Sequence, residues 1–280
     1  DSDFVTSGTI VTAFVEMDGY QFYGNADGYI YNSDLNSITS YSSLGKLTAA
    51  MAPDPPIALA RYKNTIIVFG TASFEVFENV GNSTGSPLQR IPQYASRIGS
   101  QGQRSVAALE DDIFYISSSK YGELSVQRLK DLKSQTVSPS IVNRILGTAA
   151  RSGSLYMSGF QLGGYNHIAV VVLTSSEVSD LLLLEDGDGL LLETADDVIL
   201  EGSANETAVF GRMFVYNAGL NLWSEWDTQL VTFITGASGG VVNQLFGTSR
   251  INTSGKIYTI NPVSDGELST DDGSAYTMEI

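Results

Sequence analysis

The chain contains no cysteine and a single histidine, His167, among its 280 residues. Disulfide bonds, thiol nucleophiles and cysteine-ligated zinc are therefore excluded, and one histidine cannot form a histidine metal cluster within one chain. No run of 18 apolar residues is present, and the longest uncharged apolar stretch, residues 168–173, has the length of a strand. The sequence therefore predicts no membrane insertion.

Charged residues are also scarce, at 16%, and 31 acidic against 15 basic residues give a net charge of −16. A surface of that sign repels nucleic acid and anionic membranes, yet it does not exclude DNA that passes without adhering. The first residues, DSDFVTSG, lack the basic start and apolar core of a signal peptide. Because the chain opens with Asp1 and ends in a strand-like run, SAYTMEI, we expect it to be part of a longer protein.

Sequence patterns typical of β-strands are abundant. Short runs rich in Val, Ile, Tyr and Phe alternate with clusters of Gly, Asp, Asn and Ser. Residues 19–34 are typical of a hairpin, because Asp27-Gly28 suits a tight turn with φ > 0 and aromatic residues flank it. Further strands are predicted at residues 64–79, 111–129, 166–173, 211–227 and 243–262. Helical periodicity is faint, and residues 123–145 predict one helical turn at most.

The spacing of these hairpins indicates the architecture. Their first strands end at Gly24, Gly70, Ser117, Leu173 and Gly247, which are 46, 47, 56 and 74 residues apart. A unit of about 40–50 residues with four short strands is the period of a β-propeller blade. Removing the 34 residues 175–208 reduces the last interval to 40. We therefore predict an all-β, β-propeller-like domain over residues 1–280, with about five to six blades and a short-stranded β-arm (about 175–208) inserted in the fourth blade.

The inserted segment contains LLLLEDGDGLLLETADDVILEG at residues 181–202. Its Leu-Leu-Leu-Glu and Val-Ile-Leu-Glu tetrads recur every eight residues, which predicts three short strands and excludes leucine-rich repeats of 20 or more residues. Such strands bury too little to be stable alone, so they need their own propeller or a neighbouring subunit to pack against. The candidate assembly-contact residues are Leu182, Leu184, Leu190, Leu192, Val198 and Leu200.

Two motifs resemble functional sites but fit turns better. The DGDG run at 186–189 resembles a calcium loop, but Leu190 stands where an oxygen ligand is needed and Asp197 replaces the Glu of the twelfth position. A tight turn is favoured there, with weak calcium binding as an alternative. Residues 81–85 match the letters of the G-x-S-x-G nucleophile elbow, yet a Ser-Pro pair follows in place of a helix. A hairpin turn or interblade loop is the favoured interpretation.

The sequence context of the remaining candidate residues indicates a packing role and not a catalytic one. Trp223 and Trp226 are three residues apart in a predicted strand, so they point to opposite faces, which favours core and blade-edge packing over a sugar platform. His167 adjoins an apolar run and is interpreted as a hydrogen-bonded strand residue. We predict no catalytic residue, no metal and no cofactor. A secreted or surface propeller that binds or cleaves carbohydrate is the alternative function, and a calcium-dependent adhesin is a third.

The order of strands and turns in residues 68–129 resembles a known family. A strand that ends in Phe-Gly is followed by a Glu-containing strand at 74–77 and an Asn-x-Gly turn at 79–81. An Arg-Ile-Pro segment at 90–92, an Ile-Gly step and the strand at 111–115 come next. This pattern is similar to the tail hub or nozzle proteins of short-tailed bacteriophages, also called packaged-DNA stabilisation proteins. Residues 214–227 resemble a later hairpin of the same proteins.

The resemblance implies a structural virion protein without enzymatic activity, located in the phage tail after assembly in the host bacterial cytoplasm. It implies a homo-oligomeric ring, a hexamer, that contacts the portal, the adaptor and other tail proteins. Such a nozzle would retain the packaged genome and conduct double-stranded DNA during ejection without binding it specifically. The family transfers no catalytic residue to this sequence.

Overall fold

The computed structural model describes residues 11–49, 54–82, 84–118, 123–149, 154–162, 164–176, 208–226, 230–238, 241–249, 257–260, 270–271 and 274–275. Most of these residues belong to β-strands, which pair antiparallel with their neighbours in the sequence and form consecutive sheets. The predicted all-β class is confirmed.

The sheets are built in chain order. The first has the strands β1 (Val11–Met17), β2 (Tyr20–Asn25), β3 (Tyr29–Ser33) and β4 (Tyr41–Thr48). The second has β5 (Ala58–Tyr62), β6 (Thr65–Phe69), β7 (Phe74–Asn79) and β8 (Leu88–Arg90). The third has β10 (Val106–Leu109), β11 (Asp112–Ser118), β12 (Leu124–Lys130) and β13 (Lys133–Thr136), with β9 (Gly99–Ser100) paired to β11. The 3-10 helices η1 (Pro92–Tyr94) and η2 (Gln103–Ser105) lie between the second and third sheets in the sequence.

The fourth sheet has β14 (Ser154–Leu162), β15 (Tyr165–Ser176), β16 (Ala208–Asn217) and β17 (Leu222–Trp226). The fifth has three strands, β18 (Leu230–Ser238), β19 (Val241–Ser249) and β20 (Ile257–Ile260). A two-stranded sheet of β21 (Thr270–Asp271) and β22 (Ser274–Ala275) follows. The hairpin strands whose ends were used to measure the spacing in the sequence are β2, β6, β11, β15 and β19. Each is the second strand of one of the five sheets, so the spacing corresponds to one sheet per repeat.

The turn between β2 and β3 shows how the sequence closes these hairpins. Gly28 has a φ of 90°, and its N–H donates to the carbonyl of Asn25 at 3.2 Å. The Asn25 side chain closes the same turn, because its Oδ1 accepts from the N–H of Tyr29 at 3.0 Å. The predicted tight turn at Asp27-Gly28 is confirmed.

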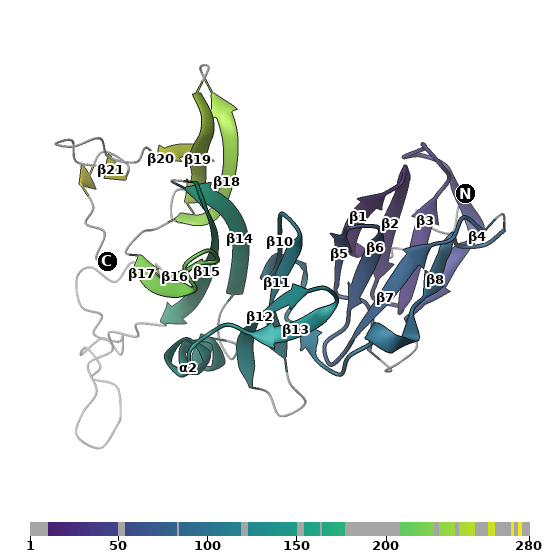
Figure 1. The fold of residues 1–280 in the computed structure, drawn as a ribbon, viewed down its shortest axis with the longest axis horizontal. Coiled ribbons are helices and arrows are strands. Elements are labelled where there is room, and N and C mark those ends of the chain that lie inside the picture. The colour runs from purple at the N-terminus through teal and green to yellow at the C-terminus, as the bar shows by residue number, and fades with distance from the viewer. Residues whose placement is uncertain are drawn as a thin grey trace, which may run out of the picture.

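The first strand of each sheet lies beside the first strand of the next sheet. β1 contacts β5, β5 contacts β10, β10 contacts β14, and β14 contacts β18. Figure 1 shows the first and second sheets at one side of the molecule, the third in the middle, and the fourth and fifth at the other side. Each sheet therefore serves as a blade with its first strand innermost, which is the arrangement of a β-propeller. The described residues contain five such sheets.

Within the described residues, apolar side chains form three layers between successive sheets, and a fourth cluster lies on the other face of the fourth sheet. The first layer, between the first and second sheets, buries Ala13, Met17, Phe22, Ile30, Leu59, Ile66, Val68, Phe77 and Leu88. The second layer, between the second and third sheets, buries Ala58, Ala60, Tyr62, Ile67, Phe69, Phe74, Val76, Ile113, Tyr115 and Leu129. The third layer, between the third and fourth sheets, buries Ala107, Phe114, Ile116, Leu124, Val126, Val142, Leu146, Met157, Ile168, Val170, Val172, Phe214 and Tyr216.

The segment predicted to be an insertion lies, in the sequence, between two paired strands of the fourth sheet. β15 ends at Ser176 and β16 begins at Ala208, and these two residues pair with each other across the strands. The insertion is therefore slightly shorter than the predicted 175–208, because both predicted end residues belong to the paired strands. The short strands predicted within it lie outside the described residues.

One expectation was wrong. Residues 140–149 form a helix, α2 (Ser140–Ala149), which is longer than the single predicted turn, and the leucines of the faint helical pattern lie mostly in β12. The helix forms because Val142 and Leu146, four residues apart on one face, are buried in the third layer. The helix therefore forms where its apolar side chains can be buried against the third layer. The apolar residues before residue 136, which suggested a helical pattern, belong to strands.

Candidate assembly interface

The predicted arm contacts lie outside the described residues. These are Leu182, Leu184, Leu190, Leu192, Val198 and Leu200. The flanking strands are described, and their last pair, Ser176 with Ala208, brings both ends of the insertion together at one end of the fourth sheet. The insertion therefore connects two adjacent strand ends.

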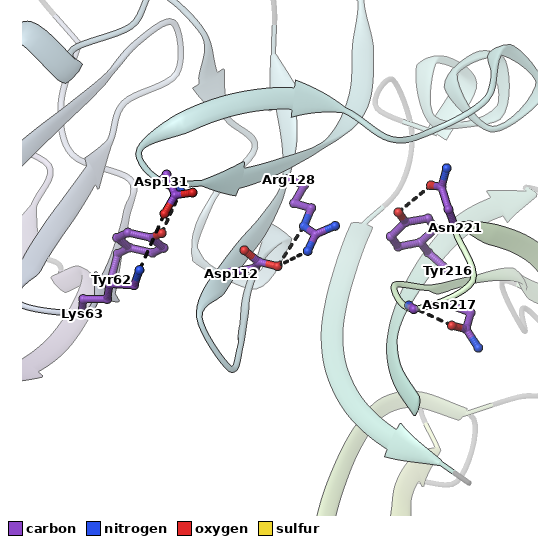
Figure 2. A network of polar contacts seen from close by, with 9 residues as sticks. Tyr62, Lys63, Asp112, Arg128, Asp131, Tyr216, Asn217 and Asn221 are labelled. Atoms are coloured by element: carbon purple, nitrogen blue, oxygen red, sulfur yellow. Dashed lines mark hydrogen bonds and ion pairs between the residues drawn. The ribbon is translucent and has the colours of Figure 1, made fainter. Parts of the chain in front are cut away.

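Polar contacts join the second sheet to the third. The Gln103 side chain pairs with the backbone of Leu59: its Oε1 accepts from the Leu59 N–H at 2.8 Å, and its Nε2 donates to the Leu59 carbonyl at 3.1 Å. The Tyr62 hydroxyl accepts from the backbone N–H of Asp131 at 2.7 Å, and Lys63 lies 3.7 Å from the Asp131 carboxylate (Figure 2). These contacts surround the second layer and fix the two sheets relative to each other.

The third and fourth sheets are joined in a similar way. The indole N–H of Trp223 donates to the carbonyl of Val137 at 2.8 Å, across the third layer. Asp112 accepts from Arg128 Nε at 2.8 Å within the third sheet, and Tyr216 donates to Asn221 at 2.7 Å within the fourth (Figure 2). Burial raises the pKa of Tyr216, whose ring lies 6.0 Å from that of Phe114.

The second sheet contains a buried charge. Glu75 on β7 has 2% of its side chain exposed, and its carboxylate lies 2.5 Å from Arg90 Nε on β8. The Arg90 guanidinium also donates to the Thr48 carbonyl of the first sheet at 3.4 Å. A buried carboxylate requires a compensating charge, so removal of Arg90 would leave the Glu75 carboxylate buried without its cation.

The first sheet has two contrasting faces. One face forms half of the first layer. The other, here called the aromatic face, carries Phe14, Tyr23, Tyr29, Tyr31, Tyr41 and Lys46. Phe14 is 48% exposed, and Ile38, whose carbonyl accepts from the Tyr41 hydroxyl at 2.9 Å, is 72% exposed. Burial is the main cause that raises the pKa of Tyr41, and the adjacent Tyr23 hydroxyl adds to the effect. The Tyr41 hydroxyl is therefore neutral at neutral pH.

The sequence did not identify the aromatic face as a candidate site. The signal was present in the hairpin at residues 19–34, where Tyr29 and Tyr31 are two residues apart and so share one face of a strand. The contribution of Phe14 could not be read in the same way, because it depends on the register between β1 and β2.

The other sequence candidates are structural. Trp223 packs against the third layer, whereas Trp226 contacts Phe160 on the opposite face of the fourth sheet, which confirms their opposite orientation. His167 is a strand residue stacked on Phe160, with ring centroids 5.3 Å apart. Burial lowers its pKa. Residues 81–85 lie between the paired strands β7 and β8, which confirms a hairpin connection.

The part of the chain that the structure describes contains neither a candidate metal site nor a candidate membrane-spanning helix. There, no group of three or more His, Asp or Glu side chains is placed to hold a metal ion. No described helix is both long and apolar enough to span a membrane.

Comparison with known proteins identifies one family. A family model described as bacteriophage P22 Gp10, β-propeller, matches residues 6–162, which is more than half of the chain. The match includes the first three sheets and β14 of the fourth. It contains residues 68–129, on which the sequence resemblance mainly rests, whereas residues 214–227 lie outside it. No curated protein matches the chain.

Solved structures with similar folds have low sequence identity. BBS1N, crystallised in complex with ARL6DN, is 11% identical with a TM-score of 0.47, and the match covers 89% of this chain and 64% of that one. The N-terminal domain of Nup159 is 10% identical with a TM-score of 0.42, and the match covers 88% and 59%. The Neurospora crassa Pan2 WD40 domain is 9% identical with a TM-score of 0.35, and the match covers 94% and 82%. The chain thus spans less than two thirds of the first two structures.

Proposed function

The chain belongs to the bacteriophage P22 Gp10 β-propeller family, and from this premise we propose that it forms part of the tail nozzle or hub through which the phage genome leaves the particle. The family consists of tail-associated structural proteins that stabilise packaged DNA. The family match over residues 6–162 is the observation that carries the proposal. The proposed role is structural and requires no catalytic residue.

The charge of the chain supports a conduit and argues against a DNA clamp. Tight binding of duplex DNA requires several Lys or Arg contacts to phosphates, and each contact releases counterions. This chain has 15 basic and 31 acidic residues, and five of the basic side chains in the described part form ion pairs with its own carboxylates. In the proposed nozzle, DNA therefore slides past the protein and is retained by closure of the channel.

The proposed assembly is a homo-oligomeric ring, a hexamer, that joins the portal, the adaptor and other tail proteins. The leucine arm within residues 177–207 is proposed to contact a neighbouring subunit or tail protein. Because Ser176 and Ala208 are already paired, residues 181–202 can be replaced by a short Gly-Ser turn without moving β15 or β16. This deletion is expected to weaken assembly while the melting temperature of the protomer is unchanged. Intact rings and tails from the deleted protein would contradict the role of the arm.

The function itself is tested by DNA retention. Phage particles are produced in cells in which the gene for the full-length protein carries a nonsense mutation, with and without the protein supplied in trans. We expect filled heads that lose their DNA in the absence of the protein and retain it when the protein is supplied. Heads that keep their DNA and infect normally without it would show that the proposed function is wrong.

A further inference from the structure

The turns of the first four sheets form one surface. Each sheet is an antiparallel meander, so the turn between its first and second strands lies at the same end as the turn between its third and fourth strands. Contacts join these ends from sheet to sheet: Asp18–Asn79 at 3.0 Å, Lys63–Asp131 at 3.7 Å and Glu110–Gln161 at 3.1 Å. The surface, here called the turn face, comprises the strand residues that adjoin the turns and residues 18–19, 34–40, 63–64, 80–82, 84–87, 110–111, 131–132, 164 and 218–221.

Large apolar side chains are exposed on the turn face. The described residues include ten exposed large hydrophobic side chains, and six of them belong to this face: Leu35, Ile38, Val80, Tyr165, Leu220 and Leu222. The opposite end of the sheets has two, Val11 and Ile141. Single exposed apolar residues are normal, but several at one end of a fold are typical of a protein-binding surface.

One group of these side chains lies on the first and second sheets. Leu35 lies against the β1–β2 turn, because a Cβ added to Gly19 would be 3.3 Å from Leu35 Cδ1. Asp18 of the same turn accepts from Asn79, which directly precedes Val80. Leu35 and Val80, 56% and 43% exposed, therefore lie on adjoining connections of two sheets.

The second group lies on the fourth sheet. Tyr165, Leu220 and Leu222 are 49%, 55% and 62% exposed. The Tyr165 ring lies beside the β16–β17 turn, since a Cβ added to Gly219 would be 3.3 Å from its Cδ1. Asn217 Oδ1 accepts from the N–H groups of Gly219 and Leu220 at 3.0 and 2.9 Å. The turn is therefore ordered before any partner arrives, so docking on it costs little conformational entropy.

The charge of the turn face restricts what can cover it. Its turns contain five acidic residues and one basic residue: Asp18, Asp34, Glu110, Asp111, Asp131 and Lys63. Lys130 and Lys133, which adjoin the turn at 131–132, reduce this excess without cancelling it. Such a surface repels DNA and anionic membranes. A second copy of this chain is also disfavoured, because its net charge is −16 and like charges across an interface weaken binding.

We propose that the turn face docks a different virion protein, whose contacting surface combines apolar side chains with an excess of Lys and Arg. The proposal rests on the proposed function and specifies which end of the propeller meets a neighbouring tail component. The two apolar groups supply the contact area, whereas the acidic residues around them select a basic partner. Ser176 and Ala208, which flank the leucine arm, lie at the opposite end of the fourth sheet, so deletion of the arm tests a different contact.

The first test measures incorporation into phage particles. Leu220→Asp is supplied in trans as the full-length protein, in cells whose own copy of the gene carries the nonsense mutation. We expect the amount of variant in purified particles to fall at least about tenfold, as for an interface hot spot, with an unchanged melting temperature of the purified variant. Ile141→Asp is the matched control, because Ile141 is 49% exposed at the opposite end of the sheets and should be incorporated normally. Normal incorporation of Leu220→Asp overturns the proposal.

A second variant tests the charge of the partner. Asp111 is exposed in the turn of the third sheet, which lies between the sheets that carry the two apolar groups. Asp111→Lys replaces an attraction to a basic surface with a repulsion, so we expect incorporation to fall by about threefold or more. Unchanged or increased incorporation would mean that the partner is not basic, which overturns the proposal.

A third measurement identifies the occupant. Leu222 is replaced by the photo-crosslinking amino acid p-benzoylphenylalanine, and crosslinked peptides from irradiated particles are identified by mass spectrometry. A crosslink to a different virion protein, in a segment with more Lys and Arg than Asp and Glu, supports the proposal. A crosslink only to the same chain, to a second copy or to DNA overturns it, as does the absence of any crosslink. If DNA retention still depends on the protein, these results refute the docking surface and leave the proposed function standing.

Discussion

The first and second sheets have the same four-stranded topology, but their strands are buried differently. In β6 of the second sheet, Ile66, Ile67, Val68 and Phe69 are all buried, so both faces of the strand are covered. In β1 of the first sheet, burial alternates, with Ala13 and Met17 buried and Phe14 exposed between them. The difference shows that a run of consecutive apolar residues indicates a sheet with two neighbours, whereas alternation indicates a sheet with one.

The largest expected effect compares one phenylalanine from each sheet. Phe69 is fully buried, and its ring lies 5.7 Å from that of Phe74 and 4.9 Å from that of Tyr115. Phe69→Ala removes these contacts and leaves a cavity, so we expect a loss of about 3–5 kcal/mol in the free energy of unfolding. Phe14→Ala, measured on the protomer, is expected to cost less than about 1 kcal/mol because the site is open to water. Urea denaturation of both variants gives the difference.

The comparison of Phe69→Ala with Phe14→Ala also tests whether the aromatic face is open to water. Equal losses for Phe69→Ala and Phe14→Ala in a dilute protomer would mean that the first sheet is also covered on both faces by its own chain. The contrast between the two sheets would then be wrong.

An intermediate effect is expected at the buried charge of the second sheet. Arg90→Met keeps most of the side-chain length but removes the cation 2.5 Å from the buried Glu75 carboxylate. We expect a loss of about 2–3 kcal/mol, because a buried carboxylate that loses its cationic partner retains its desolvation cost. The control is Arg212→Met, which breaks the exposed Arg212–Glu225 pair and should cost no more than about 0.5 kcal/mol. Similar losses in thermal or urea denaturation would show that Glu75 is effectively solvated.

Much of the fold could be predicted from local signals. The tight turn at Asp27-Gly28 and the interval between second strands depend on residues that are close in the sequence, and both predict the sheets correctly. The aromatic face could not be predicted, because it requires the register of three strand pairs. The same holds for Gln103 and Leu59, which are 44 residues apart, and for α2, whose apolar face is recognisable only once the third layer is known.

The smallest expected effect concerns a polar group in a sheet with neighbours on both faces. His167 Nδ1 donates to the carbonyl of Tyr165 at 3.0 Å, and its Nε2 lies 3.1 Å from Asn217 Nδ2. Asn217 Oδ1 already accepts the N–H groups of Gly219 and Leu220, so Nδ2 must be the donor and His167 Nε2 must be unprotonated. Protonation would set two donors against each other, in agreement with the lowered pKa, for which burial is the main cause.

Because the folded pKa of His167 lies below the unfolded value of about 6.5, the unfolded state binds more protons as the pH falls through this range. Stability is therefore expected to be constant above neutrality and to decrease from about pH 7 down to the folded pKa. The urea midpoint at pH 7.5 and at pH 5.5 measures this change, above the range in which ordinary carboxylates titrate. His167→Gln retains polar atoms at the position but does not titrate, so the difference between the two midpoints should shrink. An equal decrease in the variant would assign the pH dependence to other groups.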